Sequence, residues 1–278
     1  MAPGLYLVAT PIGNARDITL RTLDILQQAE VLAAEDTRSL RRLLEIHGIA
    51  LGDRPLIAYH DHNGARARPR LLAAIEAGQS VAYASEAGTP MISDPGFDLM
   101  RAAQEAGLAA TSAPGPSAMV TALTLAGLPT DRFLFAGFLP NASGARKRTL
   151  GELGAVPATL VFYESPKRLD GMLRDAEEVL GAERQATVCR ELTKKFEEVR
   201  RGSLSELAAF YGQNPAKGEI VVLIGKGEAA VVSETVMEDE IRTALETMSV
   251  RDAADSVSAK LGVKRRPVYQ LAMKLAGQ

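Results

Sequence analysis

The sequence predicts an α/β protein with two α/β domains followed by a small helical segment. Short apolar, β-leaning runs recur along the chain, and helical patterns ending in glycine, such as 37–48, 70–78 and 97–107, lie between many of them. This alternation is typical of helices packed on sheets. The predicted strands are 5–10, 30–35, 55–59, 80–85, 132–138, 158–165, 185–192 and 218–225.

A proline- and glycine-rich stretch predicts the boundary between the two domains. The segment 113–120, APGPSAMV, places two prolines around a glycine. We therefore expect domains at 1–114 and 115–228, and a helical segment at 233–278. In that last segment, Val250, Ala253, Ala254, Val257 and Leu261 share one helical face, and a second such face follows Pro267. Two short amphipathic helices with a tight join resemble a helix-turn-helix.

Composition limits the possible functions. The formal net charge is −2 over 278 residues, so any contact with nucleic acid must come from a local patch. The single cysteine, Cys189, excludes an internal disulfide and a cysteine zinc cluster and favours a reducing cytoplasm. No apolar run reaches the roughly 18 residues of a membrane span, and the start of the chain has no basic signal-peptide region. We expect a cytoplasmic protein.

Four loops at strand ends indicate a ligand site. The loops 9–14, 85–90, 113–118 and 162–168 are rich in glycine, proline, serine or threonine. Ligands of α/β proteins bind where strands end, and glycine lets a ligand approach the backbone closely. Neither a P-loop nor a dinucleotide fingerprint is present, which favours a small zwitterionic or nucleoside-like ligand. The alternative is that these loops are only tight strand-to-helix turns.

The loop motifs, taken together in chain order, resemble the tetrapyrrole methylase superfamily, and in particular its ribosomal RNA branch. The resemblance is collinear from Leu5 to about Ile224 and extends to the helical tail. It is carried by LYLVATPIGNARDITLRTLDIL, AAEDTR, SEAGTPMISDPG, APGPSA, AGLPTDRFLFAGFLP, FYESPKRL, RELTKKFEE and KGEIVVLI. One departure is Glu86, where the family usually has aspartate.

The resemblance implies a fold, a cofactor and a reaction. The fold is two α/β domains of tetrapyrrole-methylase type with the cofactor cleft between them. The cofactor is S-adenosylmethionine, and the reaction is 2′-O-methylation of a cytidine ribose in the decoding region of small-subunit ribosomal RNA. The implied partners are that RNA or the 30S subunit, and the implied assembly is a homodimer.

The resemblance also places the cofactor against the loops. The implied contact residues are Pro11, Gly13, Ser85, Gly88, Thr89, Met91, Ile92, Pro114, Gly115, Ser117, Tyr163, Glu164, Ser165, Gly218, Glu219 and Ile220.

A ribose hydroxyl is a poor acid, so transfer of a methyl group to it benefits from a proton acceptor. Asp36 and Glu86 are the foremost candidates, with Asp61, His62 and Glu164 as further ones. Asp36 could equally cap the helix that starts at Thr37. His60 and His62 have the spacing of metal ligands on a strand, but no third ligand is evident, so no metal is predicted.

Binding to RNA requires exposed positive charge. The cluster at 145–148 follows GFLP in a glycine-containing stretch and is predicted to lie in a loop beside the cleft. From Ser249 onward the tail carries six basic residues against two acidic ones. The predicted RNA contacts are therefore Arg146, Lys147, Arg148, Lys264, Arg265 and Arg266. The alternative for each cluster is a solvated face.

Two other functions are also compatible with the sequence. One is a methyltransferase that acts on a tetrapyrrole-type small molecule, as other branches of the superfamily do. The motifs AEDTR and FYESPKR and the helical tail argue against it. The other is a non-catalytic RNA-binding factor that keeps the fold. The intact set of cleft loops argues against that.

Overall fold

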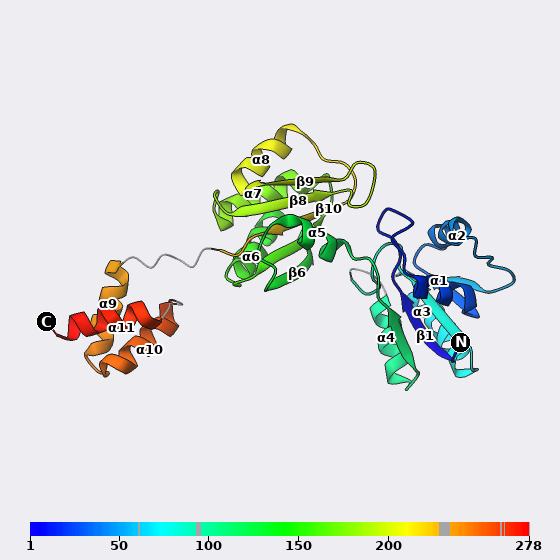
Figure 1. The fold of residues 1–278 in the computed structure, drawn as a ribbon, viewed down its shortest axis with the longest axis horizontal. Helices are drawn as coiled ribbons and strands as arrows, with labels where there is room; N and C mark the ends of the chain where they lie inside the picture. The colour runs from blue at the N-terminus through cyan, green and yellow to red at the C-terminus, as the bar shows by residue number, and fades with distance from the viewer. Residues whose placement is uncertain (61, 93–95, 228–233, 262, 264, 278) are drawn as a thin grey trace. The chain divides into compact units, whose positions relative to one another are not determined.

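The computed structural model describes residues 1–60, 62–92, 96–227, 234–261, 263 and 265–277. The chain divides into two compact units, Met1–Gly225 and Lys226–Gln278 (Figure 1). The first unit contains two five-stranded sheets, and the second is helical where it is described. No helix among the described residues is long and apolar enough to cross a membrane.

The first sheet is parallel, with strand order β3-β2-β4-β1-β5. Its strands are β1 (Gly4–Val8), β2 (Val31–Ala34), β3 (Leu56–Ala58), β4 (Ser80–Ala84) and β5 (Ala110–Ala113). The helices are α1 (Leu20–Gln28), α2 (Thr37–Ile46), α3 (Gly64–Glu76) and α4 (Gly96–Glu105). Because alternate strand residues face opposite sides, the sheet has two cores.

Each core of the first sheet is covered by its own pair of helices. Tyr83 on β4 packs in one core with Leu71 of α3 and Leu99 of α4. On the other face, Ala82 of the same strand packs with residues of α1 and α2. A parallel sheet covered on both sides brings the carboxyl ends of its strands to one edge, where the loops can form a site.

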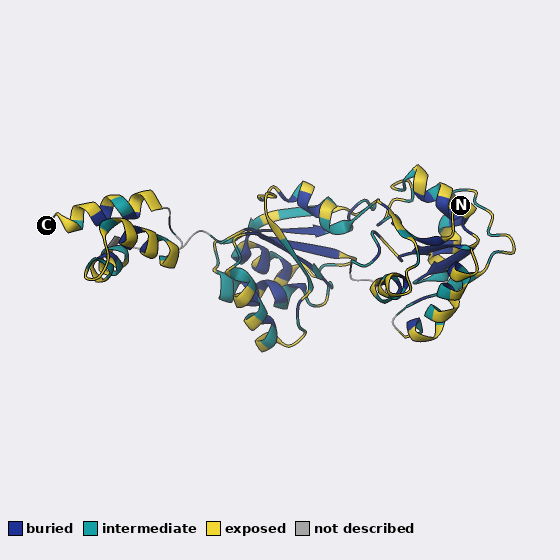
Figure 2. Cartoon of the chain, turned by 90° about the horizontal axis from the view of Figure 1, so that it is seen from below, coloured by how far each residue is buried: buried dark blue, intermediate teal, exposed yellow. Residues whose placement is uncertain are grey.

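The second sheet is mixed, with strand order β6-β7-β10-β8-β9. Its strands are β6 (Phe133–Phe138), β7 (Thr159–Glu164), β8 (Gln185–Arg190), β9 (Glu198–Ser203) and β10 (Ile220–Ile224). The helices are α5 (Ala118–Ala126), α6 (Ser143–Gly154), α7 (Leu169–Leu180) and α8 (Leu204–Gln213). In Figure 2 the strands of both sheets are mostly buried, while the helices expose their outer sides.

The helices of the second sheet are divided unequally between its faces. Phe162 and Val222 pack in one core with residues of α6, α7 and α8. The other face is covered by α5, whose Leu123 packs with Val221. Ile12, from the loop after β1, joins this second cluster. A loop of the first sheet therefore packs on the core of the second, which fixes its position at the site.

Every strand predicted from the sequence contains a strand in the structure, and the α/β fold class is confirmed. The strands that the sequence did not predict are β5 and β9, which both lie at a sheet edge. An edge strand has one free side, so it does not need the apolar run that makes a central strand recognisable.

The second unit contains α9 (Glu234–Leu245), α10 (Val250–Leu261) and α11 (Arg265–Ala276). Ile241 of α9, Val257 of α10 and Val268 of α11 meet in one apolar core. The predicted apolar face of 250–261 supplies the α10 side of that core. Gly262 and Lys264 lie outside the described residues.

Candidate functional site

Loops from both sheets of the first unit line a pocket of about 660 Å³. This size is within the range of small-molecule sites. The lining residues are Pro11, Ile12, Gly13, Glu35, Ser39, Glu86, Ala87, Gly88, Thr89, Ile92, Ser117, Ala118, Phe138, Tyr163, Glu164, Ser165, Pro166, Leu192, Lys194, Gly218, Glu219, Ile220 and Val221.

The loops after β1 and β4 are joined by hydrogen bonds. The Thr10 amide donates to the Gly88 carbonyl, and the Gly88 amide donates to the Thr10 carbonyl, both at 3.0 Å. The Thr10 hydroxyl donates to the Ser85 carbonyl at 3.1 Å, and the Ser85 hydroxyl donates to the Gly88 carbonyl at 2.6 Å. Thr89 then donates to the Pro116 carbonyl at 2.9 Å, which ties the β4 loop to the start of α5. The pocket wall is therefore largely preorganised.

Two glycines in this wall are required by close packing. Gly88 has φ +82°, and a Cβ there would lie 3.3 Å from Ile12 Cγ2. A Cβ at Gly13 would lie 2.5 Å from Lys194 Cγ. The left-handed backbone therefore favours glycine at Gly88, and the lack of lateral space favours it at Gly13.

Glu164 is a buried carboxylate in the pocket lining, and its side chain is 0% exposed. Its Oε1 accepts from the Ser165 amide at 2.7 Å. Arg168 Nε lies 3.1 Å from the same oxygen as an ion pair, without the alignment of a hydrogen bond. Oε2 has no hydrogen-bond partner among the described residues, and burial raises the pKa of the group. A cationic group of a ligand would offset this cost of burial.

The hairpin between β8 and β9 contributes a cation. Lys194 Nζ lies 2.9 Å from Glu191 Oε1 and 2.8 Å from Glu219 Oε2. Burial alone would lower the pKa of Lys194, but the hydrogen bonds to Glu219 and Glu191 raise it. The same lysine, as the first cause, lowers the pKa of Glu191. Lys194 is therefore an ammonium ion at neutral pH and a poor proton acceptor.

The structure brings most of the cofactor residues implied by the resemblance into this pocket. Those that line it are Pro11, Gly13, Gly88, Thr89, Ile92, Ser117, Tyr163, Glu164, Ser165, Gly218, Glu219 and Ile220.

Ser85, Met91, Pro114 and Gly115 do not line the pocket. Ser85 is buried and bonded to its own loop. Met91 packs against the core of the first sheet and lines a separate hollow beside α4. A Cβ at Gly115 would lie 2.8 Å from Ala9 Cβ, so this glycine permits contact between two backbone segments. These four residues are therefore not part of the pocket lining, and contact between them and the cofactor stays a prediction.

Of the two foremost catalytic candidates, Glu86 lines the pocket and Asp36 does not. Asp36 caps α2, because its side chain accepts from the Arg38 amide at 2.7 Å. The Arg38 guanidinium, the first cause, lowers the pKa of Asp36 to about 2. The structure therefore shows the helix cap that the sequence left open for Asp36, and a catalytic role for this residue stays a prediction. Of the further candidates, Asp61 lies outside the described residues and His62 is exposed, away from the pocket lining.

The histidine pair at 60 and 62 has no third ligand among the residues that the structure describes. The two rings lie 6.1 Å apart, centroid to centroid. Across the described residues, no group of three or more histidine, cysteine or acidic side chains could hold a metal ion.

The sequence did not single out Glu35, Ser39, Phe138 or Lys194 as pocket residues. The position of Lys194 in the motif RELTKKFEE was the one available signal for it.

The predicted RNA contact at Arg146 is wrong. Residues 145–148 lie on α6 and not in a loop, and Arg146 is 7% exposed. Its Nε donates to Asp175 Oδ2 of α7 at 2.6 Å, so the guanidinium is buried in a structural ion pair. Lys147 is paired with Glu178, and Arg148 is exposed.

The three basic residues of the second unit that were predicted to contact RNA are not equally free to do so. Arg265 is paired with Asp255 and lies over the Tyr269 ring. Arg266 is exposed. Lys264, the third member of that predicted cluster, is outside the described part of the chain.

Comparison with known proteins relates both units to described families. Residues 4–208 match the family of tetrapyrrole (corrin/porphyrin) methylases. Residues 237–276 match the RsmI C-terminal HTH domain.

Similar proteins match over the whole chain. A ribosomal RNA small subunit methyltransferase I from Mesorhizobium japonicum is 47% identical over 99% of this chain and 93% of its own length. The protein of the same name from Escherichia coli O157:H7 is 41% identical over 98% of this chain and 96% of its own length.

Solved structures of low sequence identity share the fold. The cobalt precorrin-4 methyltransferase CbiF has a TM-score of 0.61 at 17% identity and covers 80% of this chain and 94% of its own. Uroporphyrin-III C-methyl transferase from Thermus thermophilus, complexed with S-adenyl homocysteine, has a TM-score of 0.57 at 19% identity and covers 80% of this chain and 97% of its own. With the family match over residues 4–208 and relatives that align along their full length, the chain belongs to the tetrapyrrole methylase family, among the proteins similar to ribosomal RNA small subunit methyltransferase I.

Proposed function

We propose that the protein transfers a methyl group from S-adenosylmethionine to the 2′-hydroxyl of a cytidine ribose in the decoding region of small-subunit ribosomal RNA. The observation that carries this proposal is the full-length similarity, at 41–47% identity, to proteins named ribosomal RNA small subunit methyltransferase I. The pocket geometry supports the cofactor part of the proposal. The substrate is the RNA or the small subunit, which puts the enzyme in the cytoplasm.

The pocket residues fit a cofactor that carries positive charge. S-adenosylmethionine supplies an electrophilic methyl group on a sulfonium, and it also carries an ammonium group. Glu164 offers a buried carboxylate oxygen without a hydrogen-bond partner among the described residues. Because Gly13 and Gly88 have no side chains, a ligand can approach the backbone of the pocket wall closely. Amide groups and small side chains can then hold it. The bonded loops around Thr10 would keep the pocket in shape, which lowers the ordering cost of binding.

On the acceptor side, Glu86 is the proposed proton acceptor. It lines the pocket and is exposed, so its carboxylate can reach a hydroxyl group that enters from outside. Lys194 is held as an ammonium by two carboxylates and cannot take this role. Alignment of the hydroxyl oxygen with the methyl group would supply most of the remaining rate enhancement.

The reaction is tested with purified protein, S-adenosylmethionine, and either naked small-subunit RNA or assembled subunits. Mass spectrometry of the digested RNA should detect a methyl group on a cytidine ribose. A methyl group on the base, or product only with a tetrapyrrole, would contradict the proposal. The solved tetrapyrrole enzymes are below 20% identical in the two comparisons above, so they support the fold and not their substrate.

The assembly proposed with this function is a homodimer. Light scattering should then give twice the mass of one chain at working concentration. A mass equal to one chain would remove this part of the proposal.

A further inference from the structure

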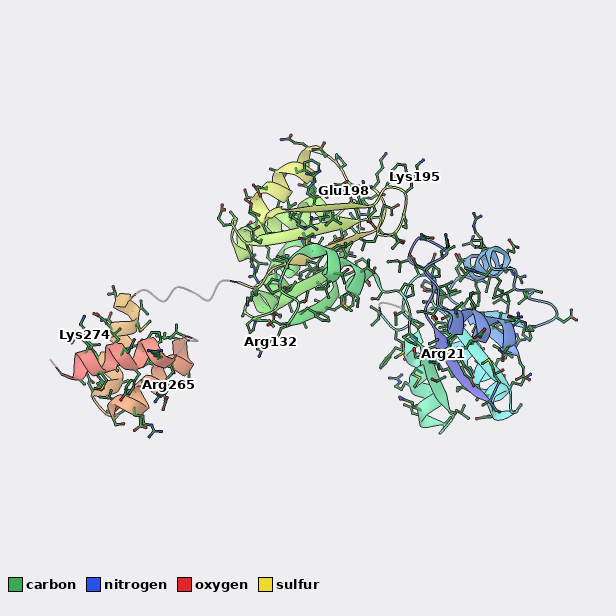
Figure 3. The ribbon with its side chains drawn as sticks, in the orientation of Figure 1. Arg21, Arg132, Lys195, Glu198, Arg265 and Lys274 are labelled. Atoms are coloured by element: carbon green, nitrogen blue, oxygen red, sulfur yellow. The ribbon has the colours of Figure 1, made fainter. Side chains whose placement is uncertain are left out.

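The hairpin between β8 and β9 carries an exposed cation and an exposed aromatic ring beside the pocket. Phe196 is 65% exposed, and Lys195 Nζ lies 5.5 Å from its ring centroid. Figure 3 shows Lys195 at the tip of this hairpin. Within the described residues Lys195 has no ion pair, unlike the neighbouring Lys194. The tip therefore presents positive charge and apolar surface that the fold itself does not use.

The hairpin is held in a defined conformation. Glu191 and Thr193 have φ of 53° and 65°, a left-handed backbone that is uncommon outside glycine. The Asn14 amide donates to the Thr193 hydroxyl at 3.1 Å, and the Glu219 amide donates to Glu191 at 2.9 Å. Such strained positions persist only where surrounding contacts fix them, and they cluster at functional sites.

The same hairpin forms part of the pocket. Leu192 and Lys194 line it, and the exposed pair follows directly in the chain. The tip is thus within one or two residues of the pocket wall. Phe138, at the end of β6, also lines the pocket and is 56% exposed. Its ring packs edge-on against Tyr163, 5.9 Å between centroids, which supports it from behind.

Exposed aromatic rings next to unpaired cations are the combination that binds single-stranded nucleic acid. Bases stack on the rings, and the cation contacts phosphate. Arg146 is buried in an ion pair and is not available for this task, whereas Lys195 is exposed and has no ion pair among the described residues. A second copy of the chain would need a broad apolar face, while this surface is a cation beside isolated rings.

We propose that Lys195, Phe196 and Phe138 form a docking surface for the single-stranded RNA nucleotides on either side of the acceptor. Phe196 and Phe138 stack on bases, and Lys195 contacts a phosphate. The inference rests on the proposed function and identifies the residues that present the acceptor to the pocket.

The test uses the full-length chain and compares Phe196→Ala, Phe196→Tyr and Lys195→Ala with wild type. Affinity for a single-stranded oligonucleotide with the decoding-region sequence is measured across salt concentrations, and cofactor affinity is measured by calorimetry. Phe196→Ala should weaken RNA binding about 5- to 150-fold, and Phe196→Tyr should restore it. Lys195→Ala should reduce the slope of the salt dependence by about one. Cofactor affinity should be unchanged in all three.

The chain offers a matched control in Phe97, which is 56% exposed with Arg101 5.6 Å from its ring centroid. Phe97 lies outside the pocket lining, so Phe97→Ala should leave RNA affinity unchanged. If wild type methylates RNA but Phe196→Ala binds RNA with wild-type affinity, the docking surface is overturned and the proposed function is not. A wild-type protein that neither binds nor methylates RNA overturns the proposed function as well. A change of mass in Phe196→Ala would assign the surface to a second copy instead.

Discussion

At the scale of single residues, Glu164 is a buried pocket carboxylate with one oxygen that has no hydrogen-bond partner among the described residues. The neutral variant Glu164→Gln should weaken S-adenosylmethionine binding by about 1.5–3 kcal/mol, because a charge-assisted contact is lost. Calorimetry measures this loss. Glu178→Gln, at a carboxylate paired with Lys147 outside the pocket lining, is the matched control and should bind normally.

The raised pKa of Glu164 also gives a pH dependence. Burial raises its folded-state pKa above the ordinary 4.5, so the folded state binds a proton more readily than the unfolded state. The ligand-free protein should therefore lose stability as pH rises from about 4.5 through the folded-state pKa. Urea unfolding at several pH values should show this loss in wild type and a smaller one in Glu164→Gln. Equal pH profiles for the two proteins would contradict the argument.

Glu86 tests the acceptor side separately. Glu86→Gln should lower kcat by a factor of about 10²–10⁴, the usual contribution of a positioned general base. Glu86→Asp, which restores the family's residue, should keep most of the activity. Cofactor affinity should stay at the wild-type value in both variants. A Gln variant with wild-type kcat would leave the pocket without an assigned proton acceptor.

At the scale of secondary-structure elements, the Arg146–Asp175 pair joins α6 to α7. Both side chains are at most 10% exposed, so removal of one partner leaves a buried charge. Arg146→Ala should lower the free energy of unfolding by about 3–5 kcal/mol, measured by urea titration. Arg148→Ala on the same helix should change it by less than about 0.5 kcal/mol because that side chain is exposed. Arg146→Met combined with Asp175→Leu should recover much of the loss, and persistence of the full loss would argue against the ion pair as its cause.

The predicted and observed strands also show which elements a local sequence pattern can reveal. Strands such as Ile220–Ile224 are recognisable because they are buried on both faces and uniformly apolar. β5 (ATSA) and β9 (EVRRGS) are edge strands defined by their pairing partners, which a local pattern cannot reveal. Each of the four predicted loops contributes residues to the pocket lining, but a loop pattern does not fix where every side chain points. Ser85 turns into its own loop, and Arg146 meets a partner 29 positions away in the chain.

At the scale of the whole molecule, the second unit is expected to add affinity for RNA without contributing to cofactor binding. Arg266 is exposed, whereas Arg265 is engaged by Asp255, so the two adjacent arginines should differ in effect. Arg266→Ala should weaken binding to small-subunit RNA and reduce the slope of its salt dependence by about one, because one phosphate contact is lost. Arg265→Ala should have the smaller effect. Figure 3 places Lys274 and Arg265 toward opposite ends of α11, which makes Lys274→Ala a control for exposed charge on the same helix.

Filter binding over a salt series measures these slopes, and calorimetry checks that cofactor affinity is unaltered. Three outcomes are then distinguishable. If Arg266→Ala alone flattens the salt dependence, the start of α11 contacts phosphate. If Arg266→Ala and Lys274→Ala behave alike, the unit attracts RNA only through its overall charge. If neither differs from wild type, the second unit has a structural role and RNA affinity resides in the first unit, where Lys195 and its hairpin provide the exposed positive charge beside the pocket.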